Sequence, residues 1–144
     1  MKSTLALMLV SLLMLACGQQ TNAEAVKKQP KQVKDCVEVI YFHGKQRCVT
    51  CRAIEQHTKE VLDAQYAKQI QSGKVVWRVI DISKKENEVI AEKYQVTWSS
   101  LFLVKHNNGK EKVENLTEFA FGNARSNPEK FKKELQLRIN QTLK

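Results

Sequence analysis

Two cysteines, Cys48 and Cys51, stand three positions apart in the stretch HGKQRCVTCRAIE (43–55). A pair at this spacing can form a redox-active disulfide, supply half of a metal site, anchor a haem or make a structural cross-link. Haem attachment requires a histidine directly after the second cysteine, and Arg52 occupies that position. A purely structural cross-link is disfavoured because so short a loop restricts the unfolded chain little. A redox pair and a metal site stay open.

The metal hypothesis rests on four sulfur or nitrogen ligands near one another in the sequence: Cys36, His43, Cys48 and Cys51. Zinc or copper would accept such a set. However, an extended strand between Cys36 and His43 separates them by up to about 20 Å, and only one closely spaced cysteine pair exists. The sequence therefore favours the redox pair, with neither metal nor another cofactor, and keeps soft-metal binding or delivery (zinc or copper) as the alternative.

The neighbours of the pair favour a reactive thiolate. CVEVIYF (36–42) is a predicted strand, and an apolar face at helical spacing begins at Cys48. Cys48 would then lie at a helix N-terminus, where free N–H groups and the helix dipole stabilise a thiolate. Lys45, Arg47 and Arg52 add positive charge, and His43 is a candidate acid–base helper. We expect Cys48 to be the exposed nucleophile and the inward-facing Cys51 the resolving thiol.

The elements that must position the pair alternate along the chain. The helical pattern runs from Cys48 to about Ile70, VVWRVIDI (75–82) predicts a central strand covered on both faces, and SKKENEVIAEKYQ (83–95) a short helix. In that helix Ser83 or Asn87 is the expected cap, with Val89, Ile90 and Tyr94 turned inward. SLFLVK (100–105), an Asn-Gly turn and EKVENL (111–116) predict a hairpin. Asn127 or Ser126 would cap a last helix that begins at Pro128.

The predicted order is β-α-β-α-β-β-α. Parallel strands joined by helical crossovers, followed by a hairpin and a final helix, give an α/β fold in three layers. In this arrangement the cysteine pair stands where the first strand leads into the first helix.

The segment VIYFHGKQRCVTCRAIE, followed by VVWRVIDISKKENEVIAEKYQVTWSSLFLVKHNNGK, resembles the thioredoxin family across nearly all of residues 36–143. More narrowly, it is similar to exported bacterial thioredoxin-like proteins, which are often membrane-anchored. The resemblance implies a thioredoxin fold and a thiol–disulfide oxidoreductase that acts on protein disulfides, with Cys48 and Cys51 as the active-site dithiol. It also implies an electron donor of the DsbD or cytochrome-biogenesis type.

Three positions depart from the family pattern. Ser99 or Ser100 stands where the family has a cis-proline, so the usual backbone for substrate docking cannot be assumed. Arg47 replaces the usual tryptophan, and the buried acid of the first strand has no counterpart, since Tyr41 or Phe42 occupies that region. We expect Trp98, Ser99 and Ser100 to form the substrate loop.

The N-terminal residues predict export. Lys2 precedes an apolar stretch that ends in LMLACG, which resembles a bacterial lipobox, with Cys17 as the lipidated residue. Residues 1–17 would be the signal peptide, 18–35 a flexible tether and 36–144 the domain. We expect a membrane-anchored lipoprotein facing the periplasm. Cleavage after Ala23, giving a soluble periplasmic protein, is the alternative.

The formal charge of the 144 residues is +9, with 24 basic and 15 acidic side chains. Export, and the mixing of basic with acidic residues, argue against nucleic acid as a partner and favour attraction to anionic membranes. Cys36 is interpreted as a small apolar residue at the start of a strand, with a third redox partner or an interchain link as the alternative. Trp77 is expected in the core.

Overall fold

The computed structural model describes residues 35–144, in which a four-stranded sheet has the order β2-β1-β3-β4. Its strands are β1 (Cys36–His43), β2 (Val75–Asp81), β3 (Ser100–Asn107) and β4 (Lys110–Asn115). β1 runs parallel to β2 and antiparallel to β3, and β3 runs antiparallel to β4. The sheet is therefore mixed, as a parallel β-α-β unit followed by a hairpin predicts.

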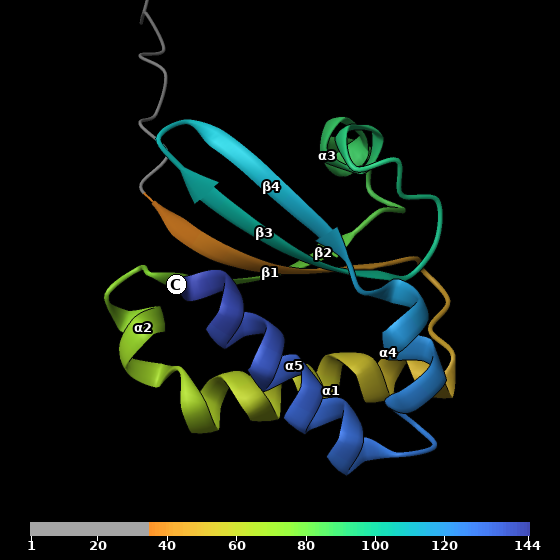
Figure 1. The fold of residues 1–144 in the computed structure, drawn as a ribbon. Coiled ribbons are helices and arrows are strands. Elements are labelled where there is room, and N and C mark those ends of the chain that lie inside the picture. Colours follow the sequence, from red (N-terminus) through yellow and green to blue (C-terminus); the bar gives the residue numbers. More distant parts are fainter. Residues whose placement is uncertain (1–34) are drawn as a thin grey trace, which may run out of the picture. The chain divides into compact units, whose positions relative to one another are not determined.

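Helices cover both faces of this sheet (Figure 1). Those on one face are α1 (Val49–Gln65), α2 (Ala67–Gln71), α4 (Thr117–Asn123) and α5 (Pro128–Leu143). The 3-10 turn η1 (Lys85–Asn87) leads into α3 (Glu88–Lys93), which lies over the other face. The three layers confirm the predicted fold class.

β1 is an inner strand, and apart from Glu38 and its last residue its side chains are apolar on both alternations. Val39 and Tyr41 enter the larger core, whereas Ile40 and Phe42 enter the smaller core under α3. A strand buried on both faces carries such a continuous apolar run. β1 is thus a rigid support from which the following loop starts.

The larger core joins the sheet to α1 and α5. Ile54 and Leu62 of α1 and Leu135 and Ile139 of α5 are all almost fully buried. The spacing of eight residues in α1 and of four in α5 places each pair of side chains on one face of its helix. This packing fixes α1 against the sheet, and so fixes the start of α1.

Two predicted local signals are confirmed. Asn108 and Gly109, with φ of 50° and 75°, form the two-residue turn between β3 and β4. Two successive left-handed residues match the twist of a hairpin, which is why Asn-Gly favours this position. At α5 the Asn127 side chain caps the helix by accepting a hydrogen bond from Lys130 N at 3.2 Å, and Pro128 is the first helical residue.

β2 corrects one prediction. It pairs only with β1 among the described residues and lies at the edge of the sheet, rather than at its centre. Its apolar residues on both faces arise because helical layers extend over both sides of the sheet. Trp77 packs against the larger core while staying partly exposed, as its position on an edge strand allows.

The helical predictions need further corrections. The helix expected from Cys48 to Ile70 is two helices, because Tyr66 leaves helical geometry with φ of −124°. Val89 points outward with 79% of its surface exposed, whereas Ile90 and Tyr94 pack inward. Neither Ser83 nor Asn87 caps α3 through its side chain, since both are hydrogen-bonded to Asp81. α4 was not predicted.

Within residues 35–144 no helix is both long and apolar enough to cross a membrane. The predicted signal peptide (1–17) and nearly all of the predicted tether (18–35) lie outside the described residues. These N-terminal boundaries stay predictions.

Candidate active site

Cys48 and Cys51 lie at the junction between β1 and α1, and they form a disulfide. Cys48 is the N-cap of α1, with an extended backbone (φ −68°, ψ 167°), and Cys51 lies in the first turn. Their Cα atoms are 5.0 Å apart, within the range that a disulfide bridges. The turn of the helix therefore brings the two thiols together without displacement of the backbone.

The two sulfurs differ in their access to solvent. Cys48 is exposed, whereas Cys51 has only 6% of its surface exposed and packs inward. Only the first can meet a disulfide on another protein. This asymmetry is the one that the sequence predicts for a nucleophile and a resolving thiol, and the assignment of these roles remains a prediction.

The backbone at the start of α1 favours negative charge on Cys48. The N–H of Cys51 donates a hydrogen bond to Cys48 Sγ across 3.0 Å. The first N–H groups of a helix have no partner within the helix, and the helix dipole points its positive end at the same place. After reduction, the same donor would stabilise a Cys48 thiolate.

The basic residues around the pair do not act alike. Lys45 and Arg52 are exposed, and the Arg52 guanidinium donates a hydrogen bond to Arg47 O at 2.6 Å. Arg47 is only partly exposed and forms an ion pair with Glu55. The carboxylate offsets much of the Arg47 charge, so Lys45 and Arg52 carry the uncompensated positive charge near the dithiol.

Tyr41 lies directly behind the dithiol, at the place for which the sequence offers no acid. Its hydroxyl donates a buried hydrogen bond to Cys51 O at 2.8 Å. The Arg47 guanidinium lies 5.7 Å from the centre of the Tyr41 ring. Burial raises the pKa of Tyr41, and the Ser99 hydroxyl and the Arg47 guanidinium offset part of that rise. The phenol is therefore protonated at neutral pH and acts as a donor.

Glu38, the acid of β1, serves elsewhere. Its carboxylate contacts His106 at 3.0 Å and Arg78 at 3.7 Å. Glu38 alternates with Val37 and Val39, so it faces away from the core that contains α1. It therefore cannot replace the buried acid of the family pattern.

His43 ends β1 next to the dithiol loop. Its Nδ1 lies 3.0 Å from Gly44 O, which fixes the ring beside its own backbone. The side chain is half-buried. The structure thus places His43 in the same loop region as the cysteines, with no hydrogen bond to either sulfur among the described contacts.

The predicted substrate loop lies between α3 and β3. Trp98 is 59% exposed and stacks on Phe121 of α4, with ring centres 5.2 Å apart. Ser99 is buried beside the Tyr41 hydroxyl, whereas the Ser100 hydroxyl donates to Trp98 O at 3.1 Å. Through Ser99 this loop reaches the group behind Cys51, and Trp98 adds an exposed aromatic surface.

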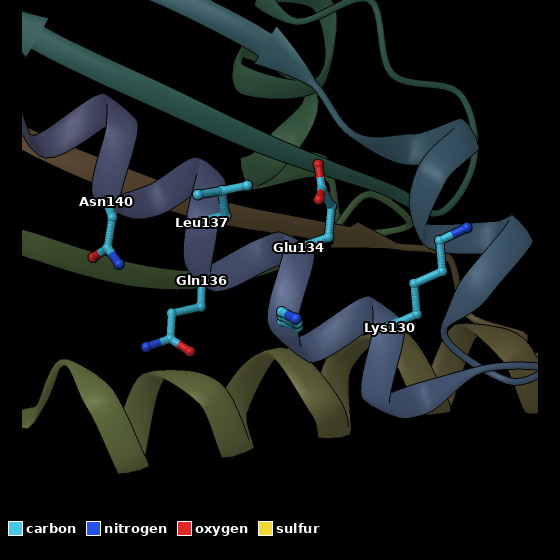
Figure 2. A pocket seen from close by; sticks show the side chains of 6 residues that line it. Lys130, Glu134, Gln136, Leu137 and Asn140 are labelled. Atoms are coloured by element: carbon cyan, nitrogen blue, oxygen red, sulfur yellow. The ribbon is translucent and has the colours of Figure 1, made fainter.

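Two hollows help to delimit the site. A cavity of about 610 Å³ opens beside Trp98 and Phe121, with Ser100 and Thr117 among its lining residues. Another hollow lies on α5 alone (Figure 2). Its lining residues are Lys130, Lys133, Glu134, Gln136, Leu137 and Asn140. Because none of these belongs to the dithiol loop or to the substrate loop, the α5 hollow is separate from the candidate active site.

The ligands of the alternative metal hypothesis are not assembled. Cys36 is a free, half-buried thiol at the start of β1, whereas His43 ends the strand. Among residues 35–144, no three His, Cys, Asp or Glu side chains are grouped closely enough to hold a metal ion. Burial, together with the nearby Glu38 and Asp35, raises the pKa of the Cys36 thiol, so this thiol is less reactive at neutral pH.

Sequence reasoning missed three contributors to the site. The sequence indicates Tyr41 only as a replacement for the missing acid, gives no link between Glu55 and Arg47, and predicts no element that contains Phe121. The first has a signal in the sequence: a tyrosine in a buried strand needs a partner for its hydroxyl. The other two contacts depend on how a loop residue packs against a helix.

The order of elements, the mixed sheet and the dithiol at the first β-to-α junction define a thioredoxin-like fold with a CxxC disulfide. The arrangement is compatible with thiol–disulfide exchange. Similar solved structures include the Trx4 domain of ERdj5, with a TM-score of 0.50 at 15% identity over 76% of this chain and 82% of that one. A thioredoxin of Fasciola hepatica gives 0.47 at 21% identity, over 75% and 82% of the two chains. A thioredoxin of Trichomonas vaginalis gives 0.49 at 18%, over 73% and 78%.

No protein-family model and no curated protein matches the chain. The likeness to solved structures therefore concerns the fold. The chemistry has to be argued from the site itself.

Proposed function

We propose that the protein is a thiol–disulfide oxidoreductase that acts on protein disulfides. One observation carries the proposal: an exposed cysteine caps a helix and is bonded to a buried cysteine one turn later. The exposed sulfur is accessible to another protein, and the helix N-terminus stabilises its thiolate. A bond that served only to stabilise the fold would gain little from so short a loop.

In the reducing direction, the Cys48 thiolate attacks one sulfur of the substrate disulfide. A Cys48–substrate disulfide forms, and the other substrate cysteine leaves as a thiolate that takes up a proton. Cys51 then loses its proton and attacks Cys48 Sγ. The Cys48–Cys51 bond forms, and the second substrate cysteine is released as a thiol. The substrate gains two electrons, and the protein loses them.

The surroundings of Cys48 bias the equilibrium. The Cys51 N–H and the exposed Lys45 and Arg52 stabilise the thiolate, which exists only in the reduced form. Stabilising the reduced form raises the reduction potential and makes the disulfide a stronger oxidant. The direction of reaction in the cell then depends on the partner that supplies or removes electrons.

An equilibrium titration of the full chain in glutathione buffers tests this function. Alkylation and peptide mass would follow each cysteine separately. We expect a reversible two-electron transition confined to Cys48 and Cys51. A reduction potential of about −270 mV would favour a reductase, and one of about −120 mV would favour an oxidant. Protection of the pair by a bound metal under reducing conditions would instead support the soft-metal alternative.

We also propose that Cys17 is lipidated and that the protein faces the periplasm from a membrane. The lipobox-like LMLACG supports this location. The Cys17→Ser variant, produced in a bacterial host, should leave the membrane fraction and lose the mass of its acyl chains. A parent protein found in the soluble fraction without the mass of acyl chains would favour cleavage after Ala23 and a soluble periplasmic protein.

An anchored reductase in an oxidising compartment needs a supply of electrons. A membrane thiol carrier of the DsbD or cytochrome-biogenesis type would provide it. The Cys51→Ala variant should trap this carrier as a mixed disulfide with Cys48. The Cys48→Ser, Cys51→Ala double variant is the matched control, and it should trap nothing. If the single variant also traps no membrane protein, this partner is wrong.

A further inference from the structure

Tyr41 lies behind the turn that carries Cys48 and Cys51, and this core side chain is hydrogen-bonded to the turn. Tyr41 lies in the middle of β1, has 0% exposed surface and pairs with Val79 and Leu101 on the neighbouring strands. Its hydroxyl reaches Cys51 O at 2.8 Å. It thus connects the sheet directly to the backbone of a reacting residue.

We propose that Tyr41 is a positioning residue for thiol–disulfide exchange, which holds the first turn of α1 so that Cys51 stays within reach of Cys48. This inference rests on the proposed function. It concerns a residue that affects the rate and the equilibrium of Cys48–Cys51 disulfide formation, whereas the proposal above concerns only the two cysteines.

The geometry gives the hydrogen bond this role. A helical carbonyl accepts one bond from within its helix and has a second lone pair, which Tyr41 occupies here. β1 lies between two other strands, so the phenol is attached to the most rigid part of the fold. Burial keeps the phenol protonated, and Arg47 and Ser99 border it. The bond therefore persists in both the disulfide and the dithiol form.

Opening the disulfide requires the two sulfurs to move apart. If Tyr41 fixes the Cys51 backbone, the exposed Cys48 has to make most of this movement. In the mixed disulfide, Cys51 then remains one turn from Cys48 Sγ. Holding two reacting groups in this way raises their effective concentration. Loss of the phenol hydroxyl should lower that effective concentration, which slows resolution and favours the open dithiol.

The test uses the full chain with Cys17→Ser and Cys36→Ser, so that only the dithiol reacts. Ellman's reagent is the oxidant. Its first thionitrobenzoate is released when the Cys48 thiolate attacks, and its second when Cys51 displaces it from Cys48 and the Cys48–Cys51 bond forms. Tyr41→Phe keeps the ring and removes the donor. We expect an unchanged first phase and a second phase slowed about fivefold, the effect of one ordinary hydrogen bond.

The equilibrium with glutathione should move in the same direction, with the effective concentration of the pair lowered about fivefold. Tyr66→Phe is the matched control. Tyr66 is almost as deeply buried, and its hydroxyl lies within hydrogen-bond distance of Gln136 O and Asn140 Oδ1 at the far end of α1. This variant should lose stability without a change in either redox measurement.

Two results would overturn the inference. One is a Tyr41→Phe protein that loses stability as Tyr66→Phe does but keeps the second phase and the glutathione equilibrium within twofold of the parent. The other applies if Tyr41→Phe does not fold. Amide hydrogen exchange is then compared between the oxidised and the reduced parent protein. If reduction speeds exchange at Cys51 and Arg52 more than tenfold, the turn is not held in place and the inference is wrong. Failure of the proposed function looks different, because the parent itself would then show no second phase.

Discussion

The amide of Cys51 donates a hydrogen bond to the sulfur of Cys48, 3.0 Å away. The residue proposed to resolve the mixed disulfide therefore also supplies, through its backbone, a contact that would stabilise the proposed attacking thiolate. Because this donor belongs to the main chain, replacement of the Cys51 side chain leaves it in place. The two roles of Cys51 can thus be separated by mutation.

This separation predicts different outcomes for the two cysteines. Cys51→Ser should keep an alkylation rate at Cys48 within about threefold of the reduced parent and should accumulate mixed disulfide, whereas Cys48→Ser should abolish reaction with protein disulfides. Mass measurement of samples quenched with acid and kept unreduced would follow alkylation and mixed-disulfide formation in both variants. Cys36→Ser is the control and should behave as the parent. Equal loss of reaction in all three variants would contradict the assignment.

The ion pair of Arg47 with Glu55 predicts a second effect. Glu55→Gln removes the compensating carboxylate, so the charge of Arg47 should act on Cys48 and raise its alkylation rate at neutral pH by about two- to fivefold. Glu60→Gln, further along α1, should change this rate little. A slower reaction in Glu55→Gln would mean that the carboxylate serves only to hold Arg47 in position.

The surroundings of Cys36 predict its pH dependence. Burial and two nearby acids raise the pKa of this thiol, which is neutral when protonated. A thiol with a raised pKa carries less thiolate at neutral pH and ionises only at higher pH. In a Cys17→Ser, Cys48→Ser, Cys51→Ser protein, the alkylation rate should therefore rise with a midpoint above that of a small free thiol. A midpoint at or below that of the free thiol would contradict the effect of burial.

Trp98 is expected to contribute to the binding of protein substrates rather than to the stability of the fold. It is 59% exposed and contacts Phe121, so Trp98→Ala should lower the free energy of unfolding by only about 1 kcal/mol. The rate constant kcat/KM for a protein disulfide should fall severalfold, while reaction with Ellman's reagent stays unchanged. Leu137→Ala, at a 49% exposed position on α5, is the control. Equal effects on both reactions would argue against a substrate contact.

Packing of α5 against the sheet predicts the largest loss of stability. Leu135 is fully buried in the larger core, and its replacement by alanine should lower the free energy of unfolding by about 2–5 kcal/mol. Val89→Ala, on the exposed side of α3, should change it little. Denaturant unfolding of the oxidised proteins would measure both. Similar losses in the two variants would show that the core does not depend on α5.

Local signals in the sequence predicted a large part of the fold. Asn108-Gly109 specified the hairpin, and Asn127-Pro128 specified the start of α5, because both depend on backbone preferences of adjacent residues. The junction of β1 with α1 followed from the change of apolar period near Cys48. These features need no knowledge of distant contacts.

The failures share a physical cause as well. The apolar pattern of β2 reports burial of its two faces, whereas a central or an edge position depends on backbone pairing, which side chains do not record. The link from Tyr41 to Cys51 depends on how α1 packs against β1, and the ion pair of Arg47 with Glu55 depends on how the loop before α1 folds back on that helix. The sequence could name the candidate redox thiols, but not the groups that lie around them.

The position of Cys36 at the opposite end of β1 from the dithiol has a consequence for oxidative damage. Tyr41 contacts the turn that carries the dithiol, and it lies five positions along the strand from Cys36, a distance of about 17 Å. The dithiol of one molecule therefore cannot repair a sulfenic acid or a mixed disulfide on its own Cys36. Repair of Cys36 requires a second molecule or a small thiol, so oxidative damage at Cys36 accumulates independently of the redox state of the Cys48–Cys51 pair.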